Sequence, residues 1–104
     1  ANEQPDYPHW FIIDMGKTVT IASFECFRRQ GDNRGPTEVQ FMTSLDGITW
    51  VDQGTYPFNP DTDSGQIFTM SSYPKARYFK FIATKGRSHF AFLAEINVYG
   101  SVID

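Results

Sequence analysis

The sequence predicts an all-β fold, an antiparallel β-sandwich. Short runs rich in Val, Ile, Thr, Phe and Tyr alternate with turn residues, as they do in sandwiches and barrels. No window of about eleven residues shows the i, i+3, i+4, i+7 spacing of an amphipathic helix without interruption by Gly, Pro or a β-branched residue. Aromatic residues make up 16% of the 104 residues, and this composition favours pleated sheets.

Seven strands are expected, each ended by turn residues. Met15-Gly16-Lys17 should turn the chain after the first strand, because Gly16 can adopt a positive φ. Asp46-Gly47 is the strongest hairpin signal, since both residues tolerate left-handed conformations, so the strands around it should pair antiparallel. The remaining breaks are the Gly-, Pro- and Asn-containing stretches at 30–36, 56–64, 71–75 and 85–88. The expected strands are His9–Asp14, Thr18–Arg28, Thr37–Ser44, Ile48–Gly54, Gln66–Met70, Ala76–Ala83 and Phe90–Tyr99.

Length and composition limit the class of protein. The chain is long enough for one domain with a real core, which we place at 9–104 behind an extended, proline-bearing arm at 1–8. Cys26 is the single cysteine, so no internal disulfide can form. No apolar run approaches the ~18 residues of a membrane helix. A net charge of −3 argues against nucleic acid as a partner.

Catalytic motifs are missing from the sequence. It contains no G-x-S-x-G, H-E-x-x-H, C-x-x-C or phosphate-binding glycine loop. His9 and His89 lie far apart at strand starts, where polar edge residues are common. Asp61-Thr62-Asp63-Ser64-Gly65 is similar to a calcium loop, but its glycine falls at the fifth position instead of the sixth, so we interpret it as a turn. The domain is not expected to be an enzyme by itself.

One segment suggests a binding site for hydroxyl groups. Arg28 and Arg29 end a strand and lead into a polar glycine loop that contains Asn33. The planar guanidinium and the carboxamide can together hold vicinal sugar hydroxyls, and an aromatic ring such as Phe90 can stack on the apolar face of a sugar. The alternatives are a solvated loop whose cations balance nearby acids, and a Phe90 that packs in the core.

Five short segments follow one another along most of the chain: Pro8–Gly16, Arg29-Gln30, Ser44–Trp50, Ala76–Lys80 and Leu93–Gly100. Together, and in this order, they resemble the discoidin or coagulation factor 5/8 type C family, and in particular its family 32 carbohydrate-binding modules. The resemblance implies a β-sandwich jelly roll, galactose-binding-like, without catalytic activity, that binds the exposed end of a glycan. It covers most of the chain, but the family's amino-terminal strands have no counterpart here.

The resemblance also implies roles for particular residues. Arg29 and Asn33 match the sugar-contacting arginine and asparagine of the family, and Phe90 matches its stacking aromatic residue. Arg28 is the reserve for Arg29, because a β-bulge would exchange the two side chains. For the family's structural calcium site, Ala94 would supply a backbone carbonyl and Glu95 a carboxylate. Two ligands cannot complete the six to eight oxygens that calcium prefers, so no cofactor is assigned.

The leading hypothesis is therefore a noncatalytic carbohydrate-binding module within a larger protein. Its partners would be a glycan, such as terminal galactose or N-acetylhexosamine, and a catalytic domain of the same parent chain, with no nucleic acid and no membrane insertion. From the resemblance we expect an extracellular, cell-surface or periplasmic location in a bacterium. The alternative is a structural or protein-interaction β-sandwich without a sugar site, and an independent enzyme is the weakest hypothesis.

Overall fold

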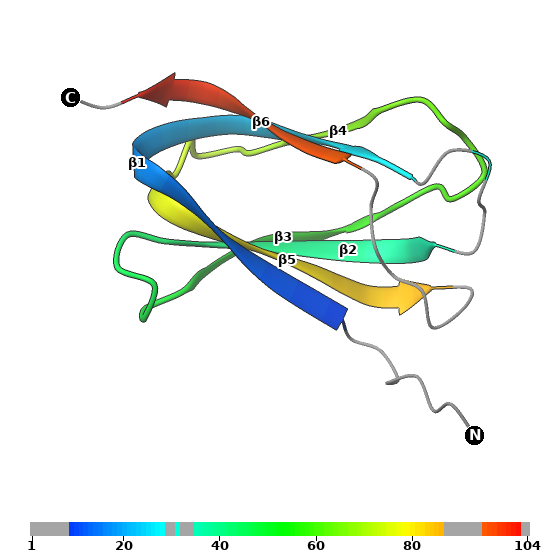
Figure 1. Cartoon of the computed structure of the whole chain (residues 1–104), viewed down its shortest axis with the longest axis horizontal. Helices are drawn as coiled ribbons and strands as arrows, with labels where there is room; N and C mark the ends of the chain where they lie inside the picture. Colours follow the sequence, from blue (N-terminus) through cyan, green and yellow to red (C-terminus); the bar gives the residue numbers. More distant parts are fainter. Residues whose placement is uncertain (1–8, 29–30, 32–34, 87–94, 103–104) are drawn as a thin grey trace.

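The computed structural model describes residues 9–28, 31, 35–86 and 95–102, and it confirms the all-β prediction (Figure 1). Every pairing between the strands is antiparallel. None of the described residues belongs to a helix that could cross a membrane. The strands are β1 (His9–Phe27), β2 (Pro36–Ser44), β3 (Val51–Pro57), β4 (Gln66–Thr69), β5 (Lys75–Gly86) and β6 (Glu95–Val102).

The strands form two layers, and β1 belongs to both (Figure 1). The first half of β1 pairs with β5, which continues through β2 to β3 in the lower layer of the view. The second half of β1 lies in the upper layer between β4 and β6, because residues 23–26 pair with β4 along one edge and with β6 along the other. The sandwich predicted from the sequence is therefore present.

The expected turn at Met15-Gly16-Lys17 was wrong, because β1 runs through it as one strand. The chain keeps its direction and pairs with β5 both before and after Gly16, with a shift of register between Asp14 and Val19. Gly16 has the positive φ that was expected, +80°, and its N–H donates to Asp14 Oδ1 at 2.8 Å. This irregularity bends β1 from the lower layer into the upper one.

The Asp46-Gly47 hairpin is confirmed as an antiparallel pairing of β2 and β3, but its connection is wider than a tight turn. β2 ends at Ser44 and β3 begins at Val51 instead of Ile48, because Asp46 closes a loop over 45–50. Its Oδ1 accepts the N–H groups of Thr49 at 2.9 Å and Ile48 at 2.8 Å. These bonds lower the pKa of Asp46.

The last strand also differs from its prediction. β6 begins at Glu95 and extends to Val102, beyond the expected end at Tyr99. Residues 90–94 of the expected strand lie outside the described residues, as does the expected arm at 1–8.

Phenylalanine fills the space between the layers. The rings of Phe24 in the upper layer and Phe41 in the lower layer stack with centroids 4.4 Å apart, so they join the two layers directly. Cys26 lies in the same core with no exposed surface, and burial raises the pKa of its thiol to about 12. Further buried side chains of this core are Ile21, Val39, Phe58, Phe68, Met70, Ala76, Phe79, Phe81 and Ala83.

Candidate functional site

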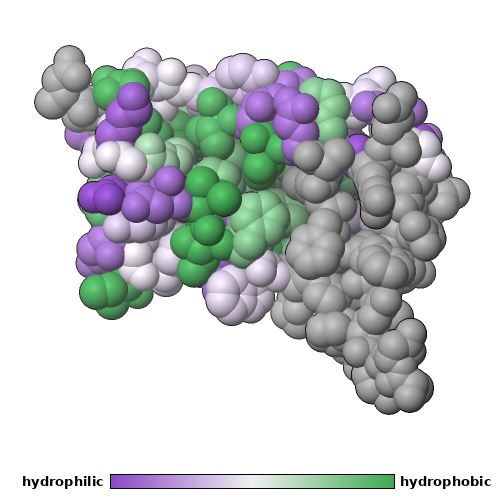
Figure 2. All heavy atoms as spheres, viewed as in Figure 1, coloured by the Kyte–Doolittle hydropathy of each residue, from purple (hydrophilic) through white to green (hydrophobic). Residues whose placement is uncertain are grey.

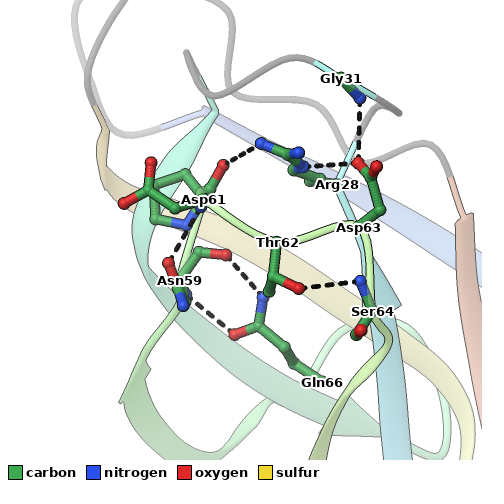
Figure 3. Close-up of polar contacts among 9 residues, drawn as sticks. Arg28, Gly31, Asn59, Asp61, Thr62, Asp63, Ser64 and Gln66 are labelled. Carbon is green, nitrogen blue, oxygen red and sulfur yellow. Dashed lines mark hydrogen bonds and ion pairs between the residues drawn. The ribbon is translucent and has the colours of Figure 1, made fainter.

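A polar cluster lies where β1 ends, beside the loop that joins β3 to β4 (Figure 3). Arg28 follows the last residue of β1. Its Nε donates to Asp63 Oδ1 at 2.7 Å, and its Nη1 donates to the backbone carbonyl of Pro60 at 2.7 Å. Only 12% of the Arg28 side chain is exposed, against 50% for Asp63. The guanidinium therefore joins the end of β1 to the 58–65 loop.

Gly31 gives the cluster a second connection. Its N–H donates at 2.9 Å to Asp63 Oδ1, the same oxygen that accepts the Arg28 bond (Figure 3). Gly31 has a φ of +73°, a left-handed conformation that glycine adopts without steric cost. The Gly31 N–H, and then the Arg28 guanidinium, lower the pKa of Asp63. A single ionised oxygen thus holds two points of the chain, on either side of residues 29–30.

The 58–65 loop is braced from within. Gln66, the first residue of β4, accepts the Asn59 N–H on Oε1 at 2.8 Å and donates from Nε2 to the Asn59 carbonyl at 2.7 Å. The Asn59 side chain accepts the N–H of Asp61 at 2.9 Å, and Thr62 Oγ1 accepts that of Ser64 at 3.1 Å. Such side-chain to backbone bonds stabilise turns, so Asp63 is displayed on a defined loop.

Of the residues that the sequence and its resemblance single out, the structure describes Arg28 and Glu95. Arg29, Asn33, Phe90 and Ala94 lie outside the described residues.

Sequence reasoning missed Asp63, because it lies 35 positions from Arg28 and no local pattern links them. The segment around Asp63 could be interpreted only as a turn.

Glu95 is the described residue of the expected calcium site. Its Oε2 accepts the Asn97 amide at 2.8 Å. Within the described ranges no group of three or more His, Cys, Asp or Glu side chains is arranged to hold a metal ion. A structural calcium ion is only what the resemblance implies, and no cofactor is assigned to the chain.

A second surface, between β6 and the bend of β1, is mainly apolar. Figure 2 shows apolar side chains, in green, lying among polar ones, in purple, on the face of the molecule that it views. Of the described residues that line the groove there, only Lys17 and Ser101 have polar side chains, so these residues do not supply the convergent polar groups of a sugar site. Its lining residues are Met15, Lys17, Val19, Val98, Gly100, Ser101 and Val102.

Comparison with known proteins gives one family and several related structures. The family model for the F5/8 type C domain matches residues 1–96. A sialidase of Micromonospora viridifaciens is 31% identical over an alignment of 109 residues. The alignment covers 94% of this chain but only 16% of the sialidase. The chain thus spans a small part of that relative's length.

Two solved structures show the likeness in three dimensions. The carboxyl-terminal domain of a chitobiase from Bacteroides fragilis is 30% identical, with a TM-score of 0.86, over 96% of this chain and 68% of that one. The module CpGH89CBM32-5 from Clostridium perfringens, solved in complex with GalNAc-β-1,3-galactose, is 25% identical, with a TM-score of 0.85, over 92% of this chain and 68% of that one.

Proposed function

Because the chain belongs to the F5/8 type C domain family, we propose that it is a noncatalytic carbohydrate-binding module that holds a parent glycan-degrading enzyme at its substrate. The observation that supports this most directly is its likeness to the Clostridium module whose structure contains GalNAc-β-1,3-galactose. We infer that the ligand is a terminal galactose or N-acetylhexosamine. The likeness to a chitobiase domain and to part of a sialidase supports a glycan-degrading parent. Such a parent would act outside the cell, at its surface or in the periplasm.

The sugar contacts belong, in this proposal, to Arg29, Asn33 and Phe90. A guanidinium and a carboxamide would bind adjacent hydroxyls, and the phenyl ring would stack on the C–H face of the sugar. Arg28, named above as the reserve for Arg29, has a different role in this proposal. Its Nε and Nη1 already donate within the protein and its side chain is nearly covered, so we assign it the role of an anchor.

Weak affinity fits this role. A few hydrogen bonds and one stacked ring bury little area, and binding must also offset the desolvation of the hydroxyls. We expect a Kd of roughly 0.1 to 1 mM for a monosaccharide, or about −4 to −5.5 kcal/mol. Tethering to a catalytic domain raises the effective substrate concentration, so even a weak site would help the parent enzyme.

Calorimetric or NMR titration with galactose, N-acetylgalactosamine and N-acetylglucosamine tests the proposal. The double variant Arg29→Ala, Asn33→Ala should lose binding. The control is Arg77→Ala, which removes from β5 an exposed arginine that pairs with Asp14 of β1, and this variant should bind like wild type. Flat titrations at several millimolar of each sugar would favour the structural or protein-interaction domain instead.

A further inference from the structure

We propose that Asp63 is a positioning residue, which holds the segment between Arg28 and Gly31 in the conformation that binds sugar. This inference rests on the proposed function, because the segment contains Arg29. Asp63 lies in the loop between β3 and β4, far in sequence from the residues proposed to touch the ligand. It would act on the sugar only through the chain that it holds.

The geometry places an anchor on each side of the proposed contact residue. Asp63 Oδ1 accepts Arg28 Nε–H at 2.7 Å and Gly31 N–H at 2.9 Å (Figure 3). Only Arg29 and Gln30 lie between these two points in the chain. A chain segment of two residues between fixed ends has few conformations open to it, so the two bonds to Asp63 are, in this proposal, what favours the conformation in which Arg29 can contact a sugar.

Asp63 can serve as an anchor because its own loop is held in place. The two hydrogen bonds between Gln66 and Asn59 close the loop at the start of β4. The strand β4 pairs with residues 23–26 of β1, just before Arg28. Arg28 Nη1 adds a direct bond to the carbonyl of Pro60. The loop and the end of β1 thus form one braced unit, on which Asp63 can hold Gly31.

Removing the charge of Asp63 should loosen this anchor without unfolding the domain. The side chain is half exposed, so Asp63→Asn leaves no buried cavity. Bonds to an ionised acceptor are stronger than bonds to a neutral amide oxygen, and Arg28 would also lose its ionic partner. The segment would then occupy its binding conformation for a smaller fraction of the time, and the apparent Kd rises as the inverse of that fraction.

The chain offers a close match as a control. Asp14 Oδ1 also accepts the N–H of a glycine with positive φ, Gly16 at 2.8 Å, and the Nε–H of an arginine, Arg77 at 2.9 Å. This second cluster lies at the bend of β1, whereas the first lies where β1 ends. Asp14→Asn thus removes the same kind of charge from the same kind of contacts, in a part of the fold that we do not connect with sugar.

The experiment compares wild type, Asp63→Asn and Asp14→Asn by calorimetric titration with galactose and N-acetylgalactosamine, and by thermal unfolding. We expect Asp63→Asn to raise the apparent Kd by about threefold to tenfold. This corresponds to a fall of the binding-competent fraction of the protein to between about a third and a tenth of its wild-type value. Asp14→Asn should bind sugar like wild type, and its change in Tm should be similar to that of Asp63→Asn. The Gly31 amide resonance in a ¹H–¹⁵N NMR spectrum should shift in Asp63→Asn and stay in place in Asp14→Asn.

Each outcome of these measurements supports or contradicts the positioning role of Asp63. If wild type binds sugar and Asp63→Asn binds equally well, the positioning role is wrong and the proposed function stands. If Asp14→Asn loses as much affinity, the effect is general destabilisation, and the positioning role is also wrong. If wild type binds none of galactose, N-acetylgalactosamine and N-acetylglucosamine, both proposals fall. Should Asp63→Asn not fold, Arg28→Lys, which keeps the charge but loses the forked donors to Asp63 and Pro60, should show the same threefold to tenfold loss.

Discussion

The left-handed backbone of Gly31 predicts that Gly31→Ala destabilises the domain through conformation alone. A Cβ added at Gly31 would meet none of the described residues within 4 Å, so these residues add no steric clash. The φ of +73° is the cause, because an L-residue pays about 1–2 kcal/mol in this region. Alanine also restricts the unfolded chain, which returns about 0.4–1 kcal/mol. The net loss is about 1 kcal/mol, or a Tm lower by about 4 to 8 °C for a domain of this size.

Thermal unfolding by circular dichroism measures this loss, and Gly16→Ala is its control. Gly16 has a φ of +80°, and a Cβ added there would meet no atom of the described part of the chain within 4 Å. Its N–H also donates to an aspartate, so Gly16→Ala should lose as much stability as Gly31→Ala. Only Gly31→Ala should also weaken sugar binding. Gly31→Asn should be more stable than Gly31→Ala, because asparagine enters the left-handed region more readily. A Gly31→Ala variant as stable as wild type would refute the reasoning.

Three further predictions concern the rest of the fold. Gly100→Ala should lower the free energy of unfolding by about 2–4 kcal/mol in a denaturant titration, because its Cβ would overlap the Thr20 carbonyl oxygen. Gly35→Ala should not, since a Cβ there would meet none of the described residues within 4 Å. Equal unfolding midpoints for the two variants would contradict this. Cys26, with its pKa raised to about 12, should not react with a disulfide reagent at pH 8 until the protein is unfolded, and rapid reaction in the native state would show that the thiol is accessible. The pKa values of Asp14, Asp46 and Asp63 are lowered in the folded protein, so as the pH falls the unfolded chain takes up these protons at a higher pH than the folded protein does. The Tm should therefore be constant above about pH 5 and fall as the pH passes below the ordinary aspartate pKa of 3.8. The fall should be shallower in Asp46→Asn, which has lost one of the three groups. A Tm that holds to pH 2.5 would argue against the three contacts.

The all-β class and most strands could be predicted, because strand propensity and turn residues act locally. Asp46-Gly47 marked a connection that the structure contains. The prediction failed at Gly16, where a positive φ is compatible with a turn and with a bulge inside one strand. The choice between them depends on the pairing with β5, whose residues lie more than fifty positions away in the sequence.

The candidate site could be predicted only in part. The sequence singles out Arg28 because it ends a strand and leads into a polar glycine loop. Its partners, Pro60 and Asp63, depend on how the β3–β4 loop folds against the end of β1. Distant contacts of this kind leave no periodic signal in a single sequence. The roles of Arg29, Asn33 and Phe90 stay predictions, which the titrations of the Arg29→Ala, Asn33→Ala variant address.

The sharing of β1 between both layers has a consequence for how the domain opens. Detaching the second half of β1 removes the central strand of the upper layer, and detaching the first half removes an edge strand of the lower one. Neither sheet therefore survives intact without the other, and the molecule should melt in a single cooperative step. In deuterium exchange, amides from both halves of β1 should then report the same free energy, that of global opening.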